Sequence, residues 1–525
     1  MDDRINLKRV MELGGQNILN MGNPDRNYLP YFRVMGPGEV SHDLAWNHNI
    51  GRWWDAMLRL EATIDFKIPA EREKVMVENL RKFCENPDNL CFGPRDNWLG
   101  IKPDFYLHSL REYILSVNSL VRYRNSTWAA DLGHKMLETI DRASKPDGTW
   151  ILEEFDTYVN YVEDKKNLVP FTPHATSGRL IEALIWYYEA TGDPLSMELA
   201  DRFARYHIKN STHPDGSLNM ASNMIPDMDP PVGHTHSYLG GLRGLFLFGQ
   251  LTKQHEYIDA VRATYEVTVR KLVRESGFAS HDLEENLGNP TQWPESTSTG
   301  DAVQLALWLG LETGHMEYLD DAERWVRSCI VPTQYPEKYS NDSNGNLDMR
   351  MLGAWGCWEL PPKGGLFSSY TDITAAVLHT LCDVYSHIAV RDKAGLTIYF
   401  HFDYEDENVR VISERGEKAQ LTIVPKCQDN VFVRIPAWTP ANSVKLTVAG
   451  KSVPVKMIGN FAFVEHVDLP QWPDIFLQYD LPIKNTTETI SGVDRHYTWK
   501  GDEIIGVCPN TVDRPIYPTC EKCPD

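Results

Sequence analysis

The sequence predicts a mainly α-helical protein in which a closed ring of paired helices is followed by a small all-β domain. Three observations support this fold class. Apolar residues recur at the helical period from the N-terminus to about residue 390. The breaks before alternate helical segments are long and polar. After Asp392 the helical period ends, and short runs rich in β-branched and aromatic residues replace it.

The segment 178–190 shows the helical pattern most clearly. Leu180, Ala183, Leu184 and Tyr187 recur at the helical spacing, and the sequence Thr-Gly-Asp-Pro at 191–194 predicts a glycine stop followed by a proline start. Similar segments predict about twelve helices. We place them near 3–20, 43–62, 70–86, 105–122, 127–143, 174–190, 195–209, 235–251, 255–274, 299–312, 316–329 and 370–389.

The regular pairing of these helices predicts either an open superhelix or a closed ring. The breaks at 144–173 and 211–233 are long and rich in Gly, Pro, Asn and Trp. Loops longer than about a dozen residues are usually functional and not plain connectors. A binding superhelix tends to have short, uniform breaks, so the sequence favours the ring.

The chain therefore divides into three parts. We expect a helical catalytic domain over 1–392, a β-sandwich over 393–505 and a C-terminal tail over 506–525. The runs 396–400, 431–435, 444–448 and 475–479 are candidate strands, separated by turns that contain glycine.

Composition excludes several classes of protein. The net charge of −21 argues against nucleic-acid binding, which needs concentrated Lys and Arg. We find no apolar run long enough to span a membrane and no secretory signal at the start of the sequence. We expect a cytoplasmic protein, with a chain trimmed of its signal as the alternative. A homo-oligomer remains open.

The nine cysteines are scattered, which is typical of free thiols and not of a disulfide framework. Cys520 and Cys523 form a CxxC motif with Cys508 upstream. Three sulfurs without an obvious fourth ligand leave a zinc site open, but the favoured interpretation is a surface tail.

Polar residues recur where the presumed inner helices begin. In a closed ring these starts meet at one mouth, and convergent His, Arg, carboxylate and aromatic groups suit a polar substrate. Each residue alone also has a structural interpretation as a helix cap or a satisfied core residue. Their recurrence favours a site. The residues are Asn47, His48, Asn49, Arg52, Asp55, Tyr106, His108, His174, Arg179, His234, His236, Glu284, Glu285, Glu295, Asp301, Ser368, Ser369, Tyr370 and Asp372.

The pair His234 and His236 could suggest a metal site. A spacing of two residues on a helix places the two rings on different faces, however. We therefore expect neither a metal nor another cofactor.

Several stretches resemble glycoside hydrolase family 127, the β-L-arabinofuranosidases. The stretch Gly-Arg-Leu-Ile-Glu-Ala at 178–183, followed by Tyr-Glu-Ala-Thr-Gly-Asp at 188–193, looks like a landmark of that family. Further matches occur in the same order, at 106–108, 233–234, 276–280 and 432–438. The resemblance implies an (α/α)6 barrel followed by β-sandwich material.

The departures from that family concern its chemistry. The family uses a cysteine nucleophile beside zinc, with a Cys-Cys pair where this chain has Ser368-Ser369. Cys357 is the nearest alternative thiol. The family's catalytic glutamate falls on Glu285, or on Glu284 if the loop shifts by one residue, and a family histidine is replaced by Arg179. This combination resembles a zinc-free branch, glycoside hydrolase family 154, whose described activity is β-glucuronidase.

The resulting hypothesis is an exo-acting glycoside hydrolase that cleaves a uronic-acid-containing glycan or oligosaccharide. It would need one protonated carboxyl group and a second carboxylate. We expect Glu285 as the acid, Glu284 as its alternative and Asp301 as the second carboxylate. The expected substrate-binding residues are Asn49, His108, His174, Arg179, His234, His236 and Tyr370.

Four other functions remain open. They are a β-L-arabinofuranosidase-like hydrolase, a polysaccharide lyase acting on uronates, a non-catalytic glycan-binding protein and a sugar epimerase.

Overall fold

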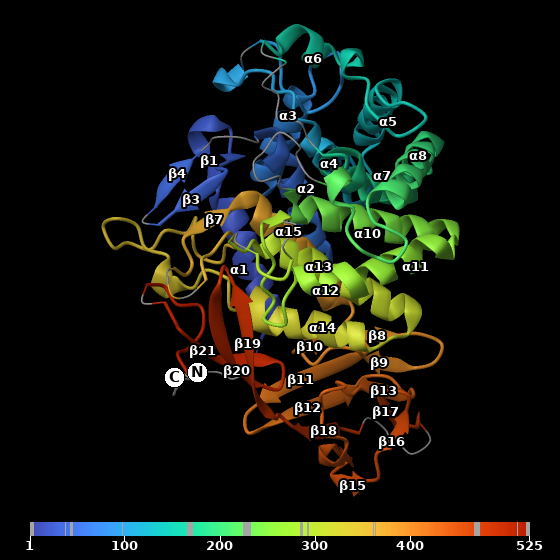
Figure 1. The fold of residues 1–525 in the computed structure, drawn as a ribbon, viewed down its shortest axis with the longest axis vertical. Helices are drawn as coiled ribbons and strands as arrows, with labels where there is room; N and C mark the ends of the chain where they lie inside the picture. The colour runs from blue at the N-terminus through green and yellow to red at the C-terminus, as the bar shows by residue number, and fades with distance from the viewer. Residues whose placement is uncertain are drawn as a thin grey trace.

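The computed structural model places the helices in one part of the molecule and most of the strands in the other (Figure 1). It describes residues 5–36, 38–41, 46–96, 98–163, 165, 172–223, 233–283, 287–290, 293–360, 362, 364–466, 473–511 and 513–520. None of the helices within these ranges is both long and apolar enough to cross a membrane.

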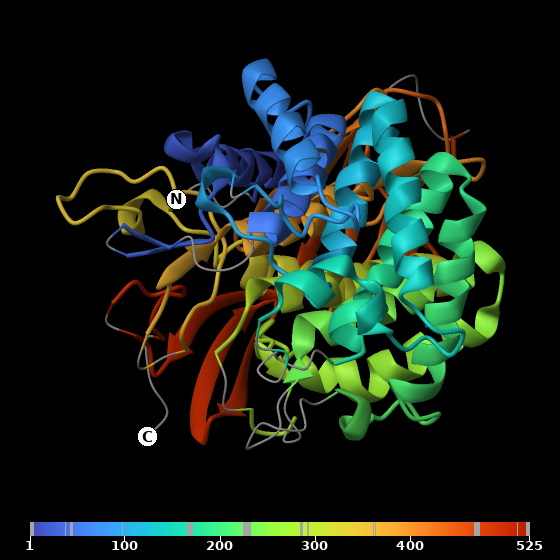
Figure 2. The same cartoon turned by 90° about the horizontal axis from the view of Figure 1, so that it is seen from above.

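Six inner helices form a closed ring, in which each helix packs on the next and the last packs on the first (Figures 1 and 2). They are α2 (Trp46–Ile64), α4 (Leu110–Arg124), α7 (Arg179–Thr191), α10 (Thr235–Thr252), α13 (Ser296–Thr313) and α15 (Thr371–Ser386). Since α15 contacts α2, the ring is closed and not an open superhelix. The predicted (α/α)6 barrel is confirmed.

An outer helix packs on each inner one. The outer helices are α1 (Leu7–Asn20) on α15, α3 (Ala70–Phe83) on α2, α5 (Thr127–Arg142) on α4, α8 (Pro194–Asn210) on α7, α11 (His255–Thr264) on α10 and α14 (Glu317–Trp325) on α13. The inner helices are buried around most of their circumference, and their buried faces include polar and charged residues as well as apolar ones.

The break between α7 and α8 follows the predicted chemistry. Gly192 adopts a left-handed conformation with φ of 72°, and its N–H donates to the carbonyl of Tyr188 at 2.7 Å. The Asp193 side chain then accepts from the N–H of Leu195, and Pro194 occupies the first turn of α8. Glycine ends one helix, and the aspartate–proline pair begins the next.

Within the described ranges, three of the helical segments contain a π-helical turn, which the sequence analysis did not anticipate. These turns are η5 (His174–Gly178) before α7, η6 (Tyr265–Val269) between α11 and α12 (Arg270–Leu272), and η7 (Val326–Ile330) after α14. A π turn widens the helix and shifts the direction of its side chains. This shift changes where the residues at the start of α7 point.

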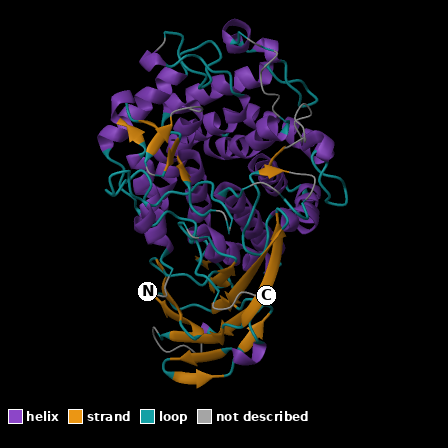
Figure 3. Ribbon diagram, turned by 60° about the vertical axis from the view of Figure 1, so that its left-hand side comes forward, coloured by secondary structure: helices purple, strands orange, loops and turns teal. Residues whose placement is uncertain are grey.

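Small sheets precede two of the inner helices at one end of the barrel (Figure 3). Strand β5 (Gly233–His234) pairs with β6 (Asp282–Leu283) and runs directly into α10. Strand β7 (Ser368–Tyr370) pairs with β3 (Arg33–Met35), which also pairs with β4 (Glu39–Ser41), and β7 runs directly into α15. A two-stranded sheet of β1 (Gly22–Asn23) and β2 (Leu29–Pro30) follows α1.

Two sheets share one apolar core after the barrel and form a sandwich. The first contains β10 (Tyr404–Glu405), β11 (Val409–Arg415), β12 (Lys418–Pro425), β18 (Ile475–Asp480), β14 (Lys445–Val448) and β15 (Lys451–Val453). The second contains β16 (Lys456–Ile458), β17 (Phe461–Val464), β13 (Val431–Arg434), β9 (Leu396–Ile398) and β8 (Ala389–Arg391). Burial alternates along β12 and β18, as expected for strands with one buried face.

A third sheet packs against the helical domain and not within the sandwich. It consists of β19 (Ile483–Ile490), β20 (Val493–Lys500) and β21 (Glu503–Cys508). Ile490 lies in one apolar cluster with Phe278 and Trp358, and the Glu488 carboxylate accepts from the Ser276 N–H at 2.9 Å. This sheet therefore connects the β-rich part of the chain to the barrel loops.

Buried ion pairs connect the β-rich part of the chain to the helical domain. Arg434 on β13 contacts both Asp320 and Glu323 of α14, and Arg327 lies 2.9 Å from Glu323 and 2.9 Å from Glu503. Most of these charges are removed from water, and Arg434, Glu323 and Arg327 each have more than one charged partner, so each buried charge stays compensated.

The cysteines differ in part from expectation. Seven are free thiols, namely Cys84, Cys91, Cys329, Cys357, Cys382, Cys427 and Cys520. Cys508 is disulfide-bonded, so the expectation of free thiols is wrong for this residue. A disulfide-bonded Cys508 cannot serve as a thiolate ligand in the zinc site considered from the sequence. Cys523, another candidate ligand of that site, lies outside the described residues.

Candidate active site

A cavity of about 250 Å³ lies where the inner helices begin. Ligand pockets usually measure ~300–1,000 Å³, so this cavity suits one small ring and not a long segment of polymer. Its histidine wall is formed by His48, His108, His234, His236 and His281. Arg52, the carboxyl groups of Glu295 and Asp372, and the rings of Phe32, Tyr106, Trp293 and Tyr370 complete its polar and aromatic lining.

The starts of five inner helices supply most of this wall. α2 contributes His48 and Arg52, and the residues just before α4 contribute Tyr106 and His108. The start of α10 contributes His234 and His236, the start of α13 contributes Glu295 and Thr297, and the start of α15 contributes Tyr370 and Asp372. The start of α7 contributes no side chain to the lining.

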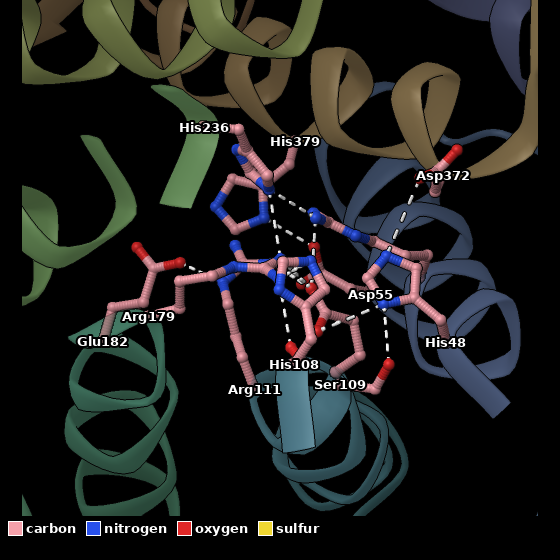
Figure 4. Close-up of polar contacts among 12 residues, drawn as sticks. His48, Asp55, His108, Ser109, Arg111, Arg179, Glu182, His236, Asp372 and His379 are labelled. Atoms are coloured by element: carbon pink, nitrogen blue, oxygen red, sulfur yellow. Dashed lines mark hydrogen bonds and ion pairs between the residues drawn. The ribbon is translucent and has the colours of Figure 1, made fainter. Parts of the chain in front are cut away.

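Glu112 on α4 is the centre of a buried charge cluster next to the cavity. Figure 4 labels three of its partners, Arg111, Arg179 and His48. The Glu112 carboxylate lies 2.7 Å from Arg179, 2.9 Å from Arg111, 3.1 Å from Arg52 and 3.5 Å from His48. Burial would raise the pKa of Glu112, but the facing cations hold it well below the usual range. Glu112 is therefore a permanent anion that fixes three guanidinium groups.

A second layer of charges extends the cluster toward α13. Arg243 lies 2.9 Å from Glu182 and 2.9 Å from Asp301, and Glu182 also pairs with Arg111. Burial raises the pKa of Asp301 to about 7, despite the cations around it. The cluster thus contains four guanidinium groups against three carboxyl groups, of which Asp301 is partly protonated near neutral pH.

Three of the cavity histidines, His48, His108 and His236, are held neutral. Burial lowers the pKa of His48 to about 3, with Arg52, Arg179 and Arg111 adding to the effect. Burial and Arg179 lower the pKa of His108 well below the usual range, and burial together with Arg179, Arg52 and Arg111 does the same for His236. Burial would also lower the pKa of His281, but the Asp282 and Glu295 carboxylates raise it to about 9. Neutral imidazoles can each donate one hydrogen bond and accept another, which suits the hydroxyl groups of a sugar.

The hydrogen bonds of His236 define its tautomer. Its Nε2 lies 2.8 Å from Arg52 and 3.1 Å from Arg179, and both of these groups can only donate. The proton therefore resides on Nδ1, which donates to Asp301 at 2.5 Å. Asp301 orients His236 from behind and does not itself line the cavity.

The two carboxyl groups on the cavity wall are held in opposite states. Burial raises the pKa of Asp372 to about 6, and its Oδ1 has no hydrogen-bond partner among the described residues. Burial would also raise the pKa of Glu295, but His234 and His281 lower it to about 2. Asp372 can thus carry a transferable proton near neutral pH, whereas Glu295 stays ionised.

The structure brings four of the seven predicted substrate-binding residues to the cavity, namely His108, His234, His236 and Tyr370. Asn49 is buried outside the lining. His174 lies against His207 and Tyr238, with ring centroids 4.9 and 5.2 Å apart, and does not reach the cavity. Arg179 is completely buried and paired with Glu112.

Of the three predicted catalytic residues, Asp301 alone lies within the described residues. Glu284 and Glu285 lie outside the described residues, immediately after Leu283 of β6, so their roles remain predictions. Asp301 accepts from His236 and does not line the cavity, so its side chain contacts a lining residue and not the cavity itself. Asp372, which the sequence places at the start of the sixth inner helix, is on the wall instead.

Neither serine nor cysteine residues offer an activated nucleophile here. Ser368 and Ser369 are completely buried and do not line the cavity. Cys357 does line it, but burial and the nearby carboxylates Glu295 and Asp372 raise its pKa well above the usual range. A protonated thiol is a poor nucleophile.

Sequence reasoning missed His281 and Trp293 entirely. Both belong to a loop between helices and have no periodic pattern around them. Hydrogen bonds between distant segments place both residues at the cavity. The His281 N–H donates to the Trp293 carbonyl at 2.9 Å, and β6 pairs with β5. The sequence analysis did identify five other lining residues as polar residues near helix starts, namely His48, Arg52, Tyr106, Glu295 and Asp372.

No protein-family model matches the sequence, and no curated protein matches it significantly. Solved structures do match. A β-arabinofuranosidase of glycoside hydrolase family 127 aligns with a TM-score of 0.60 at 14% identity, covering 96% of this chain and 83% of that one. A family 127 β-L-arabinofuranosidase from Geobacillus stearothermophilus T6 aligns with a TM-score of 0.57 at 13% identity, covering 87% and 76%.

A third match comes from another class of enzyme. Cellobiose 2-epimerase from Bacillus thermoamylovorans B4167 aligns with a TM-score of 0.51 at 10% identity, covering 70% of this chain and 95% of that one. At these identities the similarities establish the shared barrel fold. The choice of reaction must come from the site itself.

Proposed function

We propose that this protein is a glycoside hydrolase that removes one terminal sugar unit at a time. The observation that carries the proposal is Asp372, a carboxyl group with a pKa of about 6 on the wall of a small polar cavity. Glycosidic bond cleavage needs a carboxylic acid that remains protonated near neutral pH, and burial is the usual means of providing one.

The reaction would begin when Asp372 donates its proton to the glycosidic oxygen as the bond from that oxygen to the anomeric carbon breaks. A second carboxylate would then act as base for a water molecule or as nucleophile at that carbon. We assign this second role to Glu285, with Glu284 as the alternative, because Asp301 acts only through His236. The water oxygen ends on the anomeric carbon.

The remaining lining residues suit the recognition of a sugar ring. His108, His236 and Tyr370 offer neutral donors and acceptors for hydroxyl groups. Trp293 is 47% exposed at the cavity and packs its ring 5.8 Å from that of Phe367. An exposed aromatic face of this kind can stack on the apolar face of a sugar ring.

We further propose that the terminal unit is a uronic acid, as the sequence analysis expects. Arg52 replaces Arg179 as the residue that faces its carboxylate, because Arg52 lines the cavity and its Nε has no partner among the described residues.

The proposal is tested with a panel of chromogenic glycosides, in which uronides are compared with arabinofuranosides and neutral hexosides. We expect hydrolysis of uronides by the wild-type protein and a loss of activity of 10²-fold or more in Asp372→Asn. Asp259→Asn, which changes an exposed aspartate on α11, is the matched control and should keep full activity. Full activity in Asp372→Asn would remove Asp372 as the acid.

The same panel separates the two strongest alternatives. Preference for arabinofuranosides would favour the activity of the family 127 proteins, although the raised pKa of Cys357 argues against their thiolate chemistry in this chain. A lyase would release a product with a new double bond that absorbs in the ultraviolet. Burial raises the pKa of Tyr106 to about 12 and also raises that of Tyr370, which makes both phenols poor bases for a lyase.

A further inference from the structure

Three side chains at the edge of the cavity face one another in an arrangement that the proposed hydrolysis does not use. His234 lies at the start of α10, His281 lies just before β6, and Glu295 lies just before α13. Their facing atoms, the two imidazole Nε2 atoms and Glu295 Oε2, lie within 4.8 Å of one another.

The backbone holds these residues in a rigid frame. The Thr235 N–H donates to the His281 carbonyl at 3.1 Å, and the Glu295 N–H donates to the Ala279 carbonyl at 3.2 Å. Strand β5 pairs with β6, so the segments that carry the two histidines are hydrogen-bonded to each other. Ligands supplied by paired backbone segments are already positioned before an ion arrives.

The distances from Glu295 to the two histidines are close to those between the ligands of one metal ion. Glu295 Oε2 lies 3.5 Å from His234 Nε2 and 3.8 Å from His281 Nε2. A zinc ion with bonds of about 2.0–2.2 Å in tetrahedral geometry separates its ligand atoms by about 3.3–3.6 Å. The same separations are too long for good hydrogen bonds, which lie near 2.7–3.2 Å.

Each histidine is also oriented by a partner on its other nitrogen. The His281 Nδ1 lies 2.6 Å from the Asp282 carboxylate, and the His234 Nδ1 lies 2.9 Å from the Ser237 hydroxyl. Metal-binding histidines almost always use their second nitrogen in this way, which fixes the ring and directs Nε2 at the ion.

Glu295 is a buried carboxylate that faces two histidines across the edge of the cavity. Its side chain is 6% exposed, and Oε2 has no hydrogen-bond partner among the described residues. Within the same part of the chain, its ion pairs are with the two histidines and with no lysine or arginine. A buried charge is usually paired or bound to a metal.

We propose that His234, His281 and Glu295 bind a divalent cation of the zinc class, with its remaining coordination position open to the cavity. Two imidazoles and one carboxylate form a ligand set that zinc uses with an open position. The sequence analysis expected no metal because it compared His234 with His236. His236 in fact turns to Asp301 and Arg52, and the second histidine comes from another loop.

Binding can be measured independently of the proposed glycosidase activity. The full-length protein is stripped with EDTA, dialysed and titrated with ZnCl2 in a calorimeter, and metal content is measured by mass spectrometry. We expect one zinc ion per chain at this site. His281→Ala and Glu295→Gln should weaken binding at least a hundredfold, and Asp282→Asn should weaken it ten- to a hundredfold.

His315→Ala is the matched control, because His315 is an exposed histidine 3.3 Å from Glu317 at the start of α14. It should bind zinc as the wild type does. Zinc should also raise the melting temperature of the wild type and of His315→Ala, and much less that of Glu295→Gln. Circular dichroism of the metal-free proteins verifies that each variant is folded. If a ligand variant does not fold, Asp282→Asn still tests the site, because Asp282 contacts His281 and is not itself a proposed ligand.

Two results would overturn the assignment. One is a wild-type protein with no saturable zinc binding. The other is binding that survives His281→Ala and Glu295→Gln but is lost in Cys520→Ser, which would place the ion at the C-terminal cysteines. A protein that binds zinc at the proposed residues but hydrolyses no glycoside would retain the metal site and refute only the proposed function.

Discussion

Replacing Arg179 with alanine should destabilise the whole barrel and not merely weaken substrate binding. Arg179 is completely buried, and its guanidinium lies 2.7 Å from Glu112 and 3.1 Å from His236 Nε2 and donates to the His108 carbonyl at 3.0 Å. Removing one partner of a buried ion pair typically costs about 3–5 kcal/mol. Glu112 keeps Arg52 and Arg111, so we expect the lower value.

The expected change in melting temperature follows from the length of the chain. Unfolding entropy is about 2.1 cal/mol/K per residue, so 525 residues that unfold together give about 1.1 kcal/mol/K. A loss of about 3 kcal/mol therefore lowers the melting temperature by about 3 °C. Because Arg179 also positions His108 and His236, kcat/KM should fall for uronides and neutral glycosides together.

The assay combines calorimetry with kcat/KM on a uronide and on the matching neutral glycoside. Arg122→Ala is the control, since Arg122 is a part-exposed arginine 3.2 Å from Glu189 whose loss should cost about 1 kcal/mol or less. The reasoning would be refuted by an Arg179→Ala protein with unchanged melting temperature that loses uronide activity selectively. That result would restore Arg179 as the residue that binds the substrate carboxylate.

Further predictions concern the cavity. If Asp372 is the acid, kcat/KM should fall tenfold per pH unit above about pH 6, because only the protonated carboxyl group can donate a proton. A pH profile without this decrease above pH 6 would exclude Asp372 as the acid. Glu285→Gln should lower kcat by about 10²- to 10⁴-fold. A fully active Glu285→Gln together with an inactive Glu284→Gln would move the assignment from Glu285 to Glu284. Trp293→Ala should raise KM about two- to tenfold at unchanged melting temperature, and an unchanged KM would exclude stacking.

Much of the fold was accessible from the sequence because the determining signals are local. The apolar period of segments such as 178–190 identifies a helix, and glycine and proline at 192 and 194 mark where one helix ends and the next begins. Long polar breaks before alternate helices indicated the ring and which helix ends would carry the site. A closed ring of inner helices requires that these ends meet, so the positions of His108, His234 and Asp372 follow from topology.

The direction of each side chain was decided by tertiary structure. The π turn at η5 alters the rotation of the segment that enters α7, and His174 packs on His207 instead of facing the cavity. From the sequence, Arg179 could bind either a substrate carboxylate or a carboxylate of the protein. In the structure α4 packs on α7 and places Glu112 against Arg179. No local pattern specifies that choice.

The contrast is sharpest at Glu295. The sequence by itself determined that a glutamate precedes the fifth inner helix and that histidines occur at the start of the fourth. Only the pairing of β5 with β6 brings His281 beside His234, and only the packing of α13 against α10 turns the carboxylate toward both rings. Helix formation depends on residues a few positions apart, whereas a cluster of ligands depends on how distant segments pack, and for that reason the sequence located the mouth of the barrel but not the chemistry within it.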